Sequence, residues 1–290
     1  MNVRNIASFA DRVAVVTVSL AQKRSAAPIP IAEVIHHGID LNTYRYGPGG
    51  GGFLLFIGRM CEAKGVHRAV QFARQAGKRL VIVTKIREAE ERRYYEQQVR
   101  PLLGPDDPEP RELALRDRVR LLQAAEALLN PIDWPEPFGL VMAEALARGT
   151  PVLAFPRGAA PEIVEPGRTG FLCTETEDML AAIDRIPTID RRTCRAAAER
   201  RFDMHRMARD HVALYRRILA QTPSRAAVVT ASGPPDRDIA HAPVTYPGHA
   251  CSPDAIATLR RWTPEDVVHI RLRRIHRRWS PEGRGTDRPR

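Results

Sequence analysis

Two cations lie five residues apart where a buried strand is followed by a helical pattern. The apolar run from Phe53 to Ile57 has the length of a strand, and Arg59 and Lys64 come directly after it. A guanidinium group matches phosphate oxygens with a fork of donors, and an ammonium group adds a compact point charge. With the free N–H groups of a helix start, the two side chains would suit a diphosphate. Taken alone, two solvated surface cations explain the same spacing more simply.

Two carboxylates are placed around a second helix start. Glu136 precedes a predicted short helix over Phe138–Ala147, and Glu144 lies about two turns into that helix. Carboxylates accept hydrogen bonds from paired sugar hydroxyls, and a helix start binds phosphate. Gly139 has no Cβ, which lets a ligand approach the backbone closely. By itself the pair is a weak signal, because a helix-start acid and a surface glutamate give the same spacing.

Both groups belong to an alternation of short apolar runs and helical patterns. The predicted strands are Phe53–Ile57, Leu80–Val83, Ala127–Asn130 and Pro151–Phe155. Buried strands that alternate with covering helices predict an α/β domain, a Rossmann-like parallel sheet with helices on both faces. Ligands bind such sheets at the carboxyl ends of the strands, so the four charged side chains should meet there. The charged, proline-bearing stretch Asp106–Arg120 offers no clean strand where the alternation requires one.

The composition excludes several classes of protein. With 290 residues, 43% of them hydrophobic and 27% charged, the chain is predicted to be globular and soluble rather than disordered. The sequence contains no run of about eighteen apolar residues, so no transmembrane helix is predicted, and no secretory signal is recognised at the N-terminus. Four widely spaced cysteines without a C-x-x-C pair argue against a zinc site or a disulfide scaffold, and favour the cytoplasm. The net charge of +11 favours anionic partners, namely phosphorylated substrates, nucleic acid or anionic lipid.

The chain divides into four zones. Residues 1–46 precede the glycine-rich stretch 47–52, which is interpreted as a flexible linker with too little side chain to pack. Residues 53–221 hold the sheet. Residues 222–290 form a proline- and arginine-rich tail, predicted to be largely irregular and disordered except for a basic amphipathic helix over 264–279. That helix would rest on an anionic membrane surface or bind nucleic acid, although we favour the alternative that the tail has no selected role.

Taken in order, the motifs resemble the retaining glycosyltransferases of family 4, which have the two-domain GT-B fold. The joint occurrence of the motifs is far more specific than any one of them. The matching segments are Val34–Asp40, Phe56–Met60, Lys64–His67, Pro131–Glu144, Gly149–Val152, Arg157–Gly158, Pro161–Glu162 and Gly167–Phe171. The resemblance implies that 53–221 is the nucleotide-sugar donor-binding domain, the C-terminal half of a GT-B fold. It also implies that 1–46 is a remnant of the acceptor-side domain and its hinge.

The resemblance assigns a role to each site residue. It implies that Arg59 and Lys64 hold the donor diphosphate, that Glu136 is the catalytic acid contacting the transferred sugar, and that Glu144 grips the ribose hydroxyls. Backbone donors to sugar and phosphate would come from Phe138, Gly139 and Leu140. The family needs no metal and no cofactor, because cations and a helix terminus neutralise the departing nucleoside diphosphate.

Other residues remain open or structural. His36 and His37 lie at the hinge in the resemblance, where a ligand role and a local turn are equally well supported. Glu162 begins a helix and is expected to be a capping acid. His67 is expected to pack or to lie at the surface, and a core role is expected for Phe155, Ile163 and Phe171.

Three departures from the family bear on activity. Only about forty residues precede the donor domain, the stretch Asp106–Arg120 lacks its strand, and Thr84 stands close to the base where the family has glycine. The predicted activity is transfer of a hexose from a nucleotide diphosphate sugar to an unknown acceptor with retention.

The alternative is a non-catalytic nucleotide-sugar-binding remnant, or a donor half that needs a partner chain. Since transfer aligns both substrates in a closed cleft, the chain alone is expected to bind donor weakly and to transfer slowly or not at all. Nucleic-acid binding is disfavoured, because the basic residues are dispersed along the sequence.

Overall fold

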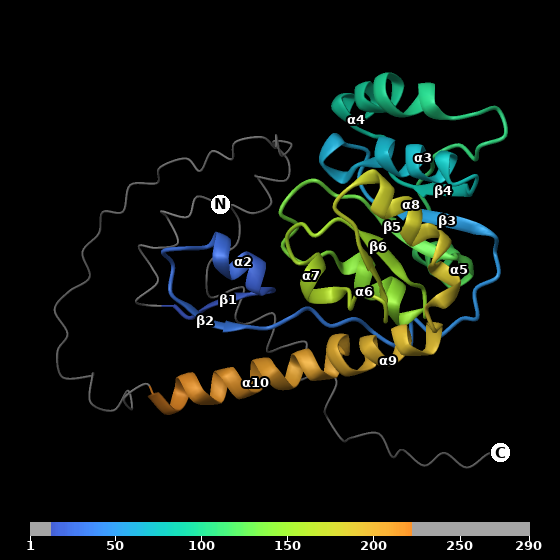
Figure 1. The fold of residues 1–290 in the computed structure, drawn as a ribbon. Coiled ribbons are helices and arrows are strands. Elements are labelled where there is room, and N and C mark those ends of the chain that lie inside the picture. Colours follow the sequence, from blue (N-terminus) through green and yellow to red (C-terminus); the bar gives the residue numbers. More distant parts are fainter. Residues whose placement is uncertain (1–12, 222–290) are drawn as a thin grey trace, which may run out of the picture. The chain divides into compact units, whose positions relative to one another are not determined.

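A five-stranded sheet, parallel throughout, forms the centre of the fold (Figure 1). The computed structural model describes residues 13–221. Its strands, in the spatial order β4-β3-β5-β6-β7, are β3 (Phe53–Ile57), β4 (Arg79–Val83), β5 (Ala127–Asn130), β6 (Val152–Ala154) and β7 (Gly170–Leu172). The predicted Rossmann-like sheet is confirmed, and each predicted strand lies within one residue of an observed one.

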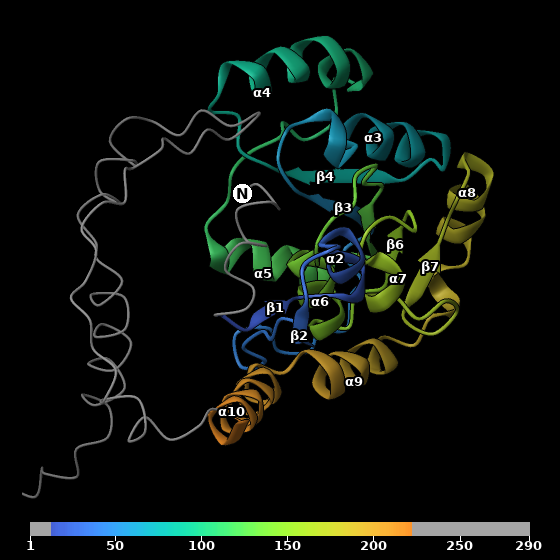
Figure 2. The ribbon, with the colours of Figure 1, turned by 90° about the vertical axis from the view of Figure 1, so that its left-hand side faces the viewer.

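Helices cover both faces of this sheet (Figure 2). On one face α3 (Val66–Gln75) packs beside β3, β4 and α8 (Thr176–Asp184), and α8 also contacts β6. On the other face α6 (Leu140–Ala147) packs beside β5 and β6, and α5 (Leu115–Ala124) and α9 (Arg191–Phe202) pack against it. Because α6 lies between the sheet and α9, most of its side chains are buried, which explains why its sequence is almost entirely apolar.

Shorter elements complete the described region. They are α4 (Ala89–Tyr94), a π-helical turn Tyr95–Val99, α7 (Ala160–Ile163), and 3₁₀ turns at Glu62–Lys64, Arg100–Leu102 and Ile186–Thr188. Among residues 13–221, no helix is long and apolar enough to cross a bilayer. The tail 222–290, with its predicted helix over 264–279, lies outside the described residues.

The strand order creates a crevice. The connection from β3 through α3 leads to β4 on one side of β3, whereas β5 lies on its other side. At such a switch point the loops that leave neighbouring strands diverge, and a ligand-binding crevice opens at their carboxyl ends. The loop after β3 carries the two predicted cations and the loop after β5 carries Glu136, while Glu144 lies in α6, the helix that follows the second loop.

The N-terminal residues form a small second sheet. Strands β1 (Val15–Thr17) and β2 (Ile31–Val34) pair in parallel, with α2 (Leu20–Ser25) between them in the chain. The last described helix, α10 (Met204–Gln221), is tied to this sheet by an ion pair of 2.6 Å between Arg217 and Glu33. The proposed domain division between residues 46 and 53 remains a prediction.

Glu162 caps a different helix from the one in which it lies. Its carboxylate accepts hydrogen bonds from the backbone N–H groups of Leu20, at 2.8 Å, and Ala21, at 2.7 Å, which open α2. The same carboxylate lies 3.0 Å from Nε2 of His36. The prediction of a capping acid is thus corrected in one respect: Glu162 caps α2 across the fold rather than its own helix α7. It joins the small sheet to the larger one.

Removal of this carboxylate should destabilise the protein. We expect Glu162→Ala to lower the free energy of unfolding by about 2–3 kcal/mol, because the two N–H donors that open α2 lose a charged acceptor. Urea denaturation of the full chain measures the change. Glu177→Ala, an exposed first-turn acid of α8, is the matched control and should cost less than about 0.5 kcal/mol. Equal midpoints for the two variants would show that the cap contributes nothing.

The glycine-rich stretch 47–52 is packed, which corrects the expectation of a linker too bare to pack. The N–H of Gly47 donates to the carbonyl of Arg148 at 3.0 Å, and that of Gly51 to the carbonyl of Ala124 at 2.9 Å. A Cβ on Gly47 would lie 1.9 Å from a carbon of Gln123. Glycine here permits a close approach of backbone to the domain surface.

The irregular stretch Asp106–Arg120 contributes one bridge and one helix. Arg111 forms an isolated parallel bridge with Val83, and its carbonyl accepts the N–H of Thr84 at 3.0 Å. The absence of a regular strand is therefore confirmed within this stretch. Helix α5 begins inside this stretch, at Leu115. The sequence did not indicate it, because most of the side chains in its first two turns are polar and only Leu122 is fully buried.

Candidate functional site

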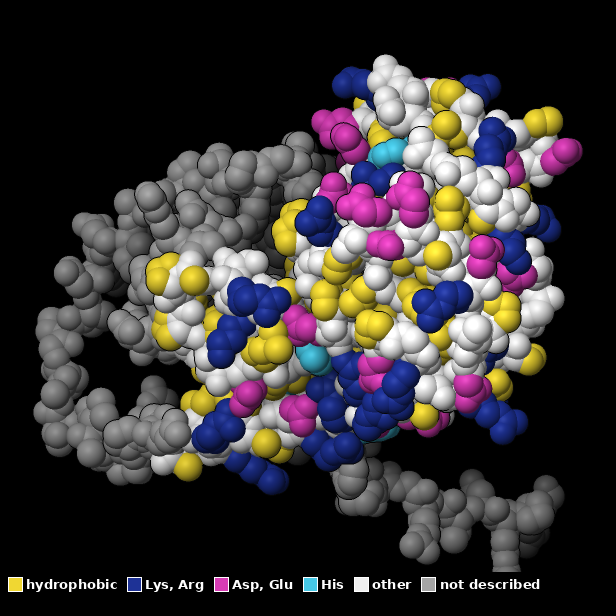
Figure 3. Space-filling model, in the orientation of Figure 1, with side chains coloured by type: hydrophobic (Ala, Val, Ile, Leu, Met, Phe, Trp, Pro, Cys, Tyr) yellow, Lys and Arg dark blue, Asp and Glu magenta, His cyan; other side chains and the backbone are white. Residues whose placement is uncertain are grey.

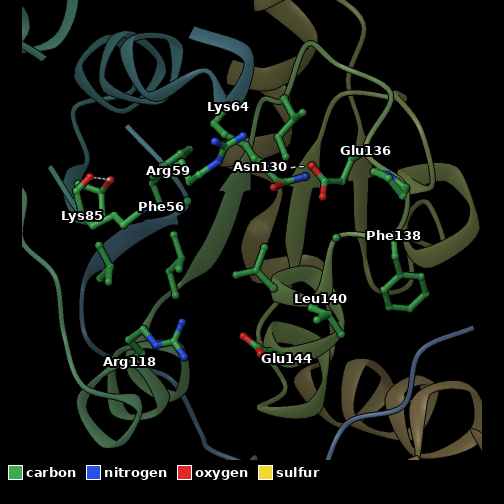
Figure 4. A pocket seen from close by; sticks show the side chains of 18 of the residues that line it. Phe56, Arg59, Lys64, Lys85, Arg118, Asn130, Glu136, Phe138, Leu140 and Glu144 are labelled. Carbon is green, nitrogen blue, oxygen red and sulfur yellow. Dashed lines mark hydrogen bonds and ion pairs between the residues drawn. The ribbon is translucent and has the colours of Figure 1, made fainter. Parts of the chain in front are cut away.

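A cavity of about 750 Å³ opens at the carboxyl ends of β3, β4 and β5. Arg59, Lys64, Glu136 and Glu144 all line it (Figure 4). The two predicted cations lie toward one end of the cavity and Glu144 toward the other. The structure therefore brings together the four charged side chains that the sequence placed on separate segments.

The loop after β3 presents the two cations differently. Arg59 is exposed at the cavity, and its guanidinium group has no hydrogen-bond or ion-pair partner within residues 13–221. Lys64, in contrast, pairs with the carboxylate of Glu136. Gly65 ends this loop with φ of +71°, and a Cβ there would lie 2.2 Å from the carbonyl oxygen of Pro131. The cation loop is thus packed directly on the loop that carries Glu136.

Glu136 is held by several contacts. Oε2 accepts from Lys64 and from the indole N–H of Trp134, the latter at 3.0 Å. Behind the loop, the backbone carbonyl of Glu136 accepts the N–H of Ala159 at 3.0 Å. Within residues 13–221 the other carboxylate oxygen, Oε1, has no hydrogen-bond or ion-pair partner, so it can accept a ligand hydroxyl.

The start of α6 forms the floor between the two carboxylates. Gly139 adopts φ of +85°, no side chain caps the helix, and Gly139 and Leu140 both line the cavity. The helix begins at Leu140 rather than at Phe138 as predicted. The ring of Phe138 is buried, edge-on to His37 at 5.1 Å and to Phe202 at 5.8 Å. Uncapped N–H groups therefore face the cavity while Phe138 anchors the loop before them.

Glu144 has a partner that sequence reasoning missed. Tyr44 donates its hydroxyl hydrogen bond to Oε1 of Glu144 at 2.8 Å. Burial, and then the nearby Glu144 carboxylate, hold the pKa of Tyr44 well above its usual range, so the phenol stays a neutral donor. Tyr44 lies only four positions after the hinge segment Val34–Asp40. Nothing in the sequence indicated that it contacts Glu144, a hundred residues further along the chain.

The two hinge histidines have different surroundings. The imidazole of His36 contacts Glu162 and stacks at an angle near Phe138, whereas His37 lines the cavity. Burial, then the proximity of His211 and His36, lowers the pKa of His37. The imidazole of His37 is therefore neutral at pH 7 and can donate or accept one hydrogen bond.

Polar side chains that were not predicted as site residues by motif also line the cavity, among them Lys85, Arg118, Asn130 and Thr84, the last already named as a departure from the family. The amide of Asn130 donates to the sulfur of Met142 at 3.3 Å. Lys85 lies 3.7 Å from Glu88 and 3.9 Å from Glu91. Thr84 and Lys85 follow β4 and Asn130 ends β5, so their strand-end position was the available signal; Arg118 lies on α5, and no such signal pointed to it.

Basic side chains gather where α9 leads into α10 (Figure 3), which the dispersed sequence positions did not indicate. Much of this charge is paired internally. Glu165 alone lies within 3.1 Å of Arg168, Arg200 and Arg201, and Arg206 lies 2.7 Å from Asp210. Three arginines on one carboxylate still leave a positive surface.

Comparison with known proteins identifies related sequences. Residues 52–188 match the family model described as "Glycosyl transferases group 1". The chain is 36% identical over 105 residues to D-inositol 3-phosphate glycosyltransferase of Nocardioides sp., covering 34% of this chain and 23% of that protein. It is 37% identical over 73 residues to N-acetyl-alpha-D-glucosaminyl L-malate synthase of Bacillus anthracis, covering 25% and 19%. The matches thus span about a quarter or less of these curated relatives.

Solved structures share the fold. AviGT4, a glycosyltransferase involved in avilamycin A biosynthesis, superposes with a TM-score of 0.61 at 28% identity, covering 71% of this chain and 64% of that one. HepE of Anabaena, solved in complex with UDP-glucose, gives 0.63 at 22% identity and covers 75% and 67%. The predicted resemblance and the GT-B type of sheet are confirmed by these matches.

Proposed function

Because residues 52–188 belong to the group 1 glycosyl transferases, we propose that the chain binds a nucleotide diphosphate sugar in this cavity and transfers its hexose to an acceptor with retention. The observation that carries the proposal is the placement of Arg59 and Lys64 beside the uncapped start of α6, with Glu136 next to them. The two cations and the backbone N–H groups can bind the diphosphate here, and the neighbouring carboxylate can accept hydrogen bonds from the hydroxyl groups of the sugar.

Each side chain then has a distinct task. Arg59, which has no partner within residues 13–221, binds the diphosphate directly. Lys64 turns from Glu136 toward the phosphates, which frees Glu136 to accept hydroxyls of the sugar. At the other end Glu144, oriented by Tyr44, accepts the ribose hydroxyls. As the sugar leaves, charge develops on the diphosphate, and cations and N–H groups already in place stabilise it.

The experiment is titration of the full chain with UDP-glucose by calorimetry, followed by a transfer assay. UDP-glucose is the first probe because a protein of the same fold was solved with it. We expect saturable binding that Arg59→Ala weakens by about tenfold, and NMR of any transferred sugar should show the donor's anomeric configuration. Failure of UDP, GDP and ADP sugars to bind at millimolar concentration would refute the proposal.

A second candidate is a donor half whose acceptor is presented by another chain. It is favoured by the walls of the cavity, since Val18 and His37 are its only lining residues in the described region that precede β3. This candidate predicts donor binding with little transfer. Rapid turnover by the chain alone would contradict it.

Tyr44→Phe tests the ribose end of the site. Loss of one hydrogen bond to a charged carboxylate should weaken UDP binding by about fivefold, because Glu144 is then free to rotate. Binding of 2′,3′-dideoxy-UDP, which lacks the hydroxyls that Glu144 would hold, should not change. Tyr46→Phe, at a nearby exposed tyrosine, is the control. Equal weakening of both ligands would argue against a ribose role.

A further inference from the structure

Arg118 is a cation in the cavity that no part of the mechanism above uses. Its side chain is half-buried, lines the cavity, and points from α5 toward Glu144 at the end away from Arg59 and Lys64 (Figure 4). In the described part of the chain it has no hydrogen-bond or ion-pair partner. A guanidinium group carries five donors and no acceptor, and leaving them unmet in a partly desolvated place is costly.

The irregular stretch after β4 brings Arg118 to this place. The bridge between Arg111 and Val83 fixes the chain beside the end of β4, and α5 begins four residues later. Thr84, Lys85 and Leu113 line the same cavity as Arg118.

Among residues 13–221, Glu144 is held only by the neutral hydroxyl of Tyr44, whereas other charged side chains near Arg118 are paired with one another. Glu112 accepts from Arg87 at 2.6 Å, and Lys85 lies near Glu88 and Glu91. On α5 itself, Asp117 lies 3.7 Å from Arg120. Arg118 is thus left facing the cavity with its donors available.

The chemistry of this end selects a neutral acceptor. A phosphate placed beside Arg118 would also meet the carboxylate of Glu144, toward which Arg118 points. A carbonyl oxygen carries no net charge and accepts guanidinium donors well. Guanine presents O6 and N7 to an arginine, and uracil presents two carbonyls, whereas adenine places an amino donor where O6 would be.

We infer that Arg118 reads the carbonyl edge of the donor's base, so that the site takes a uracil or guanine nucleotide in preference to an adenine nucleotide. The inference rests on the proposed function, because it requires the nucleoside diphosphate to lie in this cavity with its ribose at Glu144. It makes Arg118 a specificity-determining residue of that site.

The test is the affinity of the full chain for UDP, GDP and ADP by calorimetry, for the unaltered protein, Arg118→Ala and Arg118→Lys. We expect UDP or GDP to bind at least tenfold more tightly than ADP. Arg118→Ala should weaken the favoured nucleotide about tenfold and leave ADP within twofold, so that the preference disappears. Arg118→Lys keeps the positive charge but loses the paired N–H donors of the guanidinium group, so it should retain only part of the preference over ADP. Arg116→Ala, an exposed neighbour on α5, should change nothing.

Three other outcomes overturn the inference. If Arg118→Ala weakens all three nucleotides equally, Arg118 contributes only general attraction. If ADP binds the unaltered protein most tightly, the base is read in another way. If UDP and GDP bind and Arg118→Ala has no effect, the inference fails while the proposed function stands; if no nucleotide binds at all, the proposed function fails with it.

Discussion

Lys64→Ala is expected to weaken UDP binding by about 100-fold. Two effects add. The diphosphate loses a charge-assisted contact, which contributes about 1.5–3 kcal/mol, and Glu136 is left as an unpaired carboxylate beside the phosphates. Calorimetric titration of the full chain with UDP measures the loss.

The ion pair between Lys64 and Glu136 predicts the direction in which a second substitution, Glu136→Gln, changes the affinity for UDP. Because Glu136 holds Lys64 before ligand binds, Glu136→Gln should release the lysine and tighten UDP binding by a few-fold. The same variant should lose any additional affinity that the attached glucose provides. Glu144→Gln is the matched comparison: the structure gives Glu144 no lysine or arginine partner within residues 13–221, so this variant releases no cation and should not tighten UDP binding.

The double variant completes the cycle. Lys64→Ala with Glu136→Gln should bind UDP about tenfold more tightly than Lys64→Ala alone, because the unpaired negative charge is gone. Strictly additive effects would show that the two side chains do not interact, and would remove the basis for this prediction. Circular dichroism melting of each variant verifies that the fold is retained.

Gly158→Ala should lower both the stability of the fold and the affinity of the site for UDP-glucose. Gly158 has φ of +55°, and a Cβ there would lie 2.2 Å from the carbonyl oxygen of Glu136 and 2.4 Å from its nitrogen. These are backbone atoms, so the loop that carries Glu136 must move. We expect a loss of about 2–4 kcal/mol in the free energy of unfolding and at least tenfold weaker binding of UDP-glucose.

Gly167→Ala measures the cost of backbone strain alone, and so separates it from the clash of a Cβ at position 158 with the backbone of Glu136. Gly167 also has positive φ, +72°, but nothing lies within 4 Å of its would-be Cβ. Its substitution should cost about 1 kcal/mol in stability and leave UDP-glucose binding unchanged. If the two alanine variants behave alike, the approach of Gly158 to Glu136 has no role in positioning that carboxylate.

The sequence by itself determined four of the five strands of the sheet and the four charged side chains that meet at its cavity. Each strand is a short, continuous apolar run, because a parallel sheet covered on both faces buries every side chain of its strands. That requirement is local, so Phe53–Ile57 and Ala127–Asn130 could be recognised from their letters. The strand-end rule then placed Arg59, Lys64, Glu136 and Glu144 at one crevice without knowledge of any contact.

Only the tertiary structure decided which side chains hold one another. The contacts of Tyr44 with Glu144, of Glu162 with the start of α2, and of Lys64 with Glu136 join positions 72 to 142 residues apart. Arg118 reached the cavity through a stretch with no periodic pattern. Hydrophobic periodicity reports which face of an element is buried, but a hydrogen bond between distant loops depends on how several elements pack, and no local pattern records it.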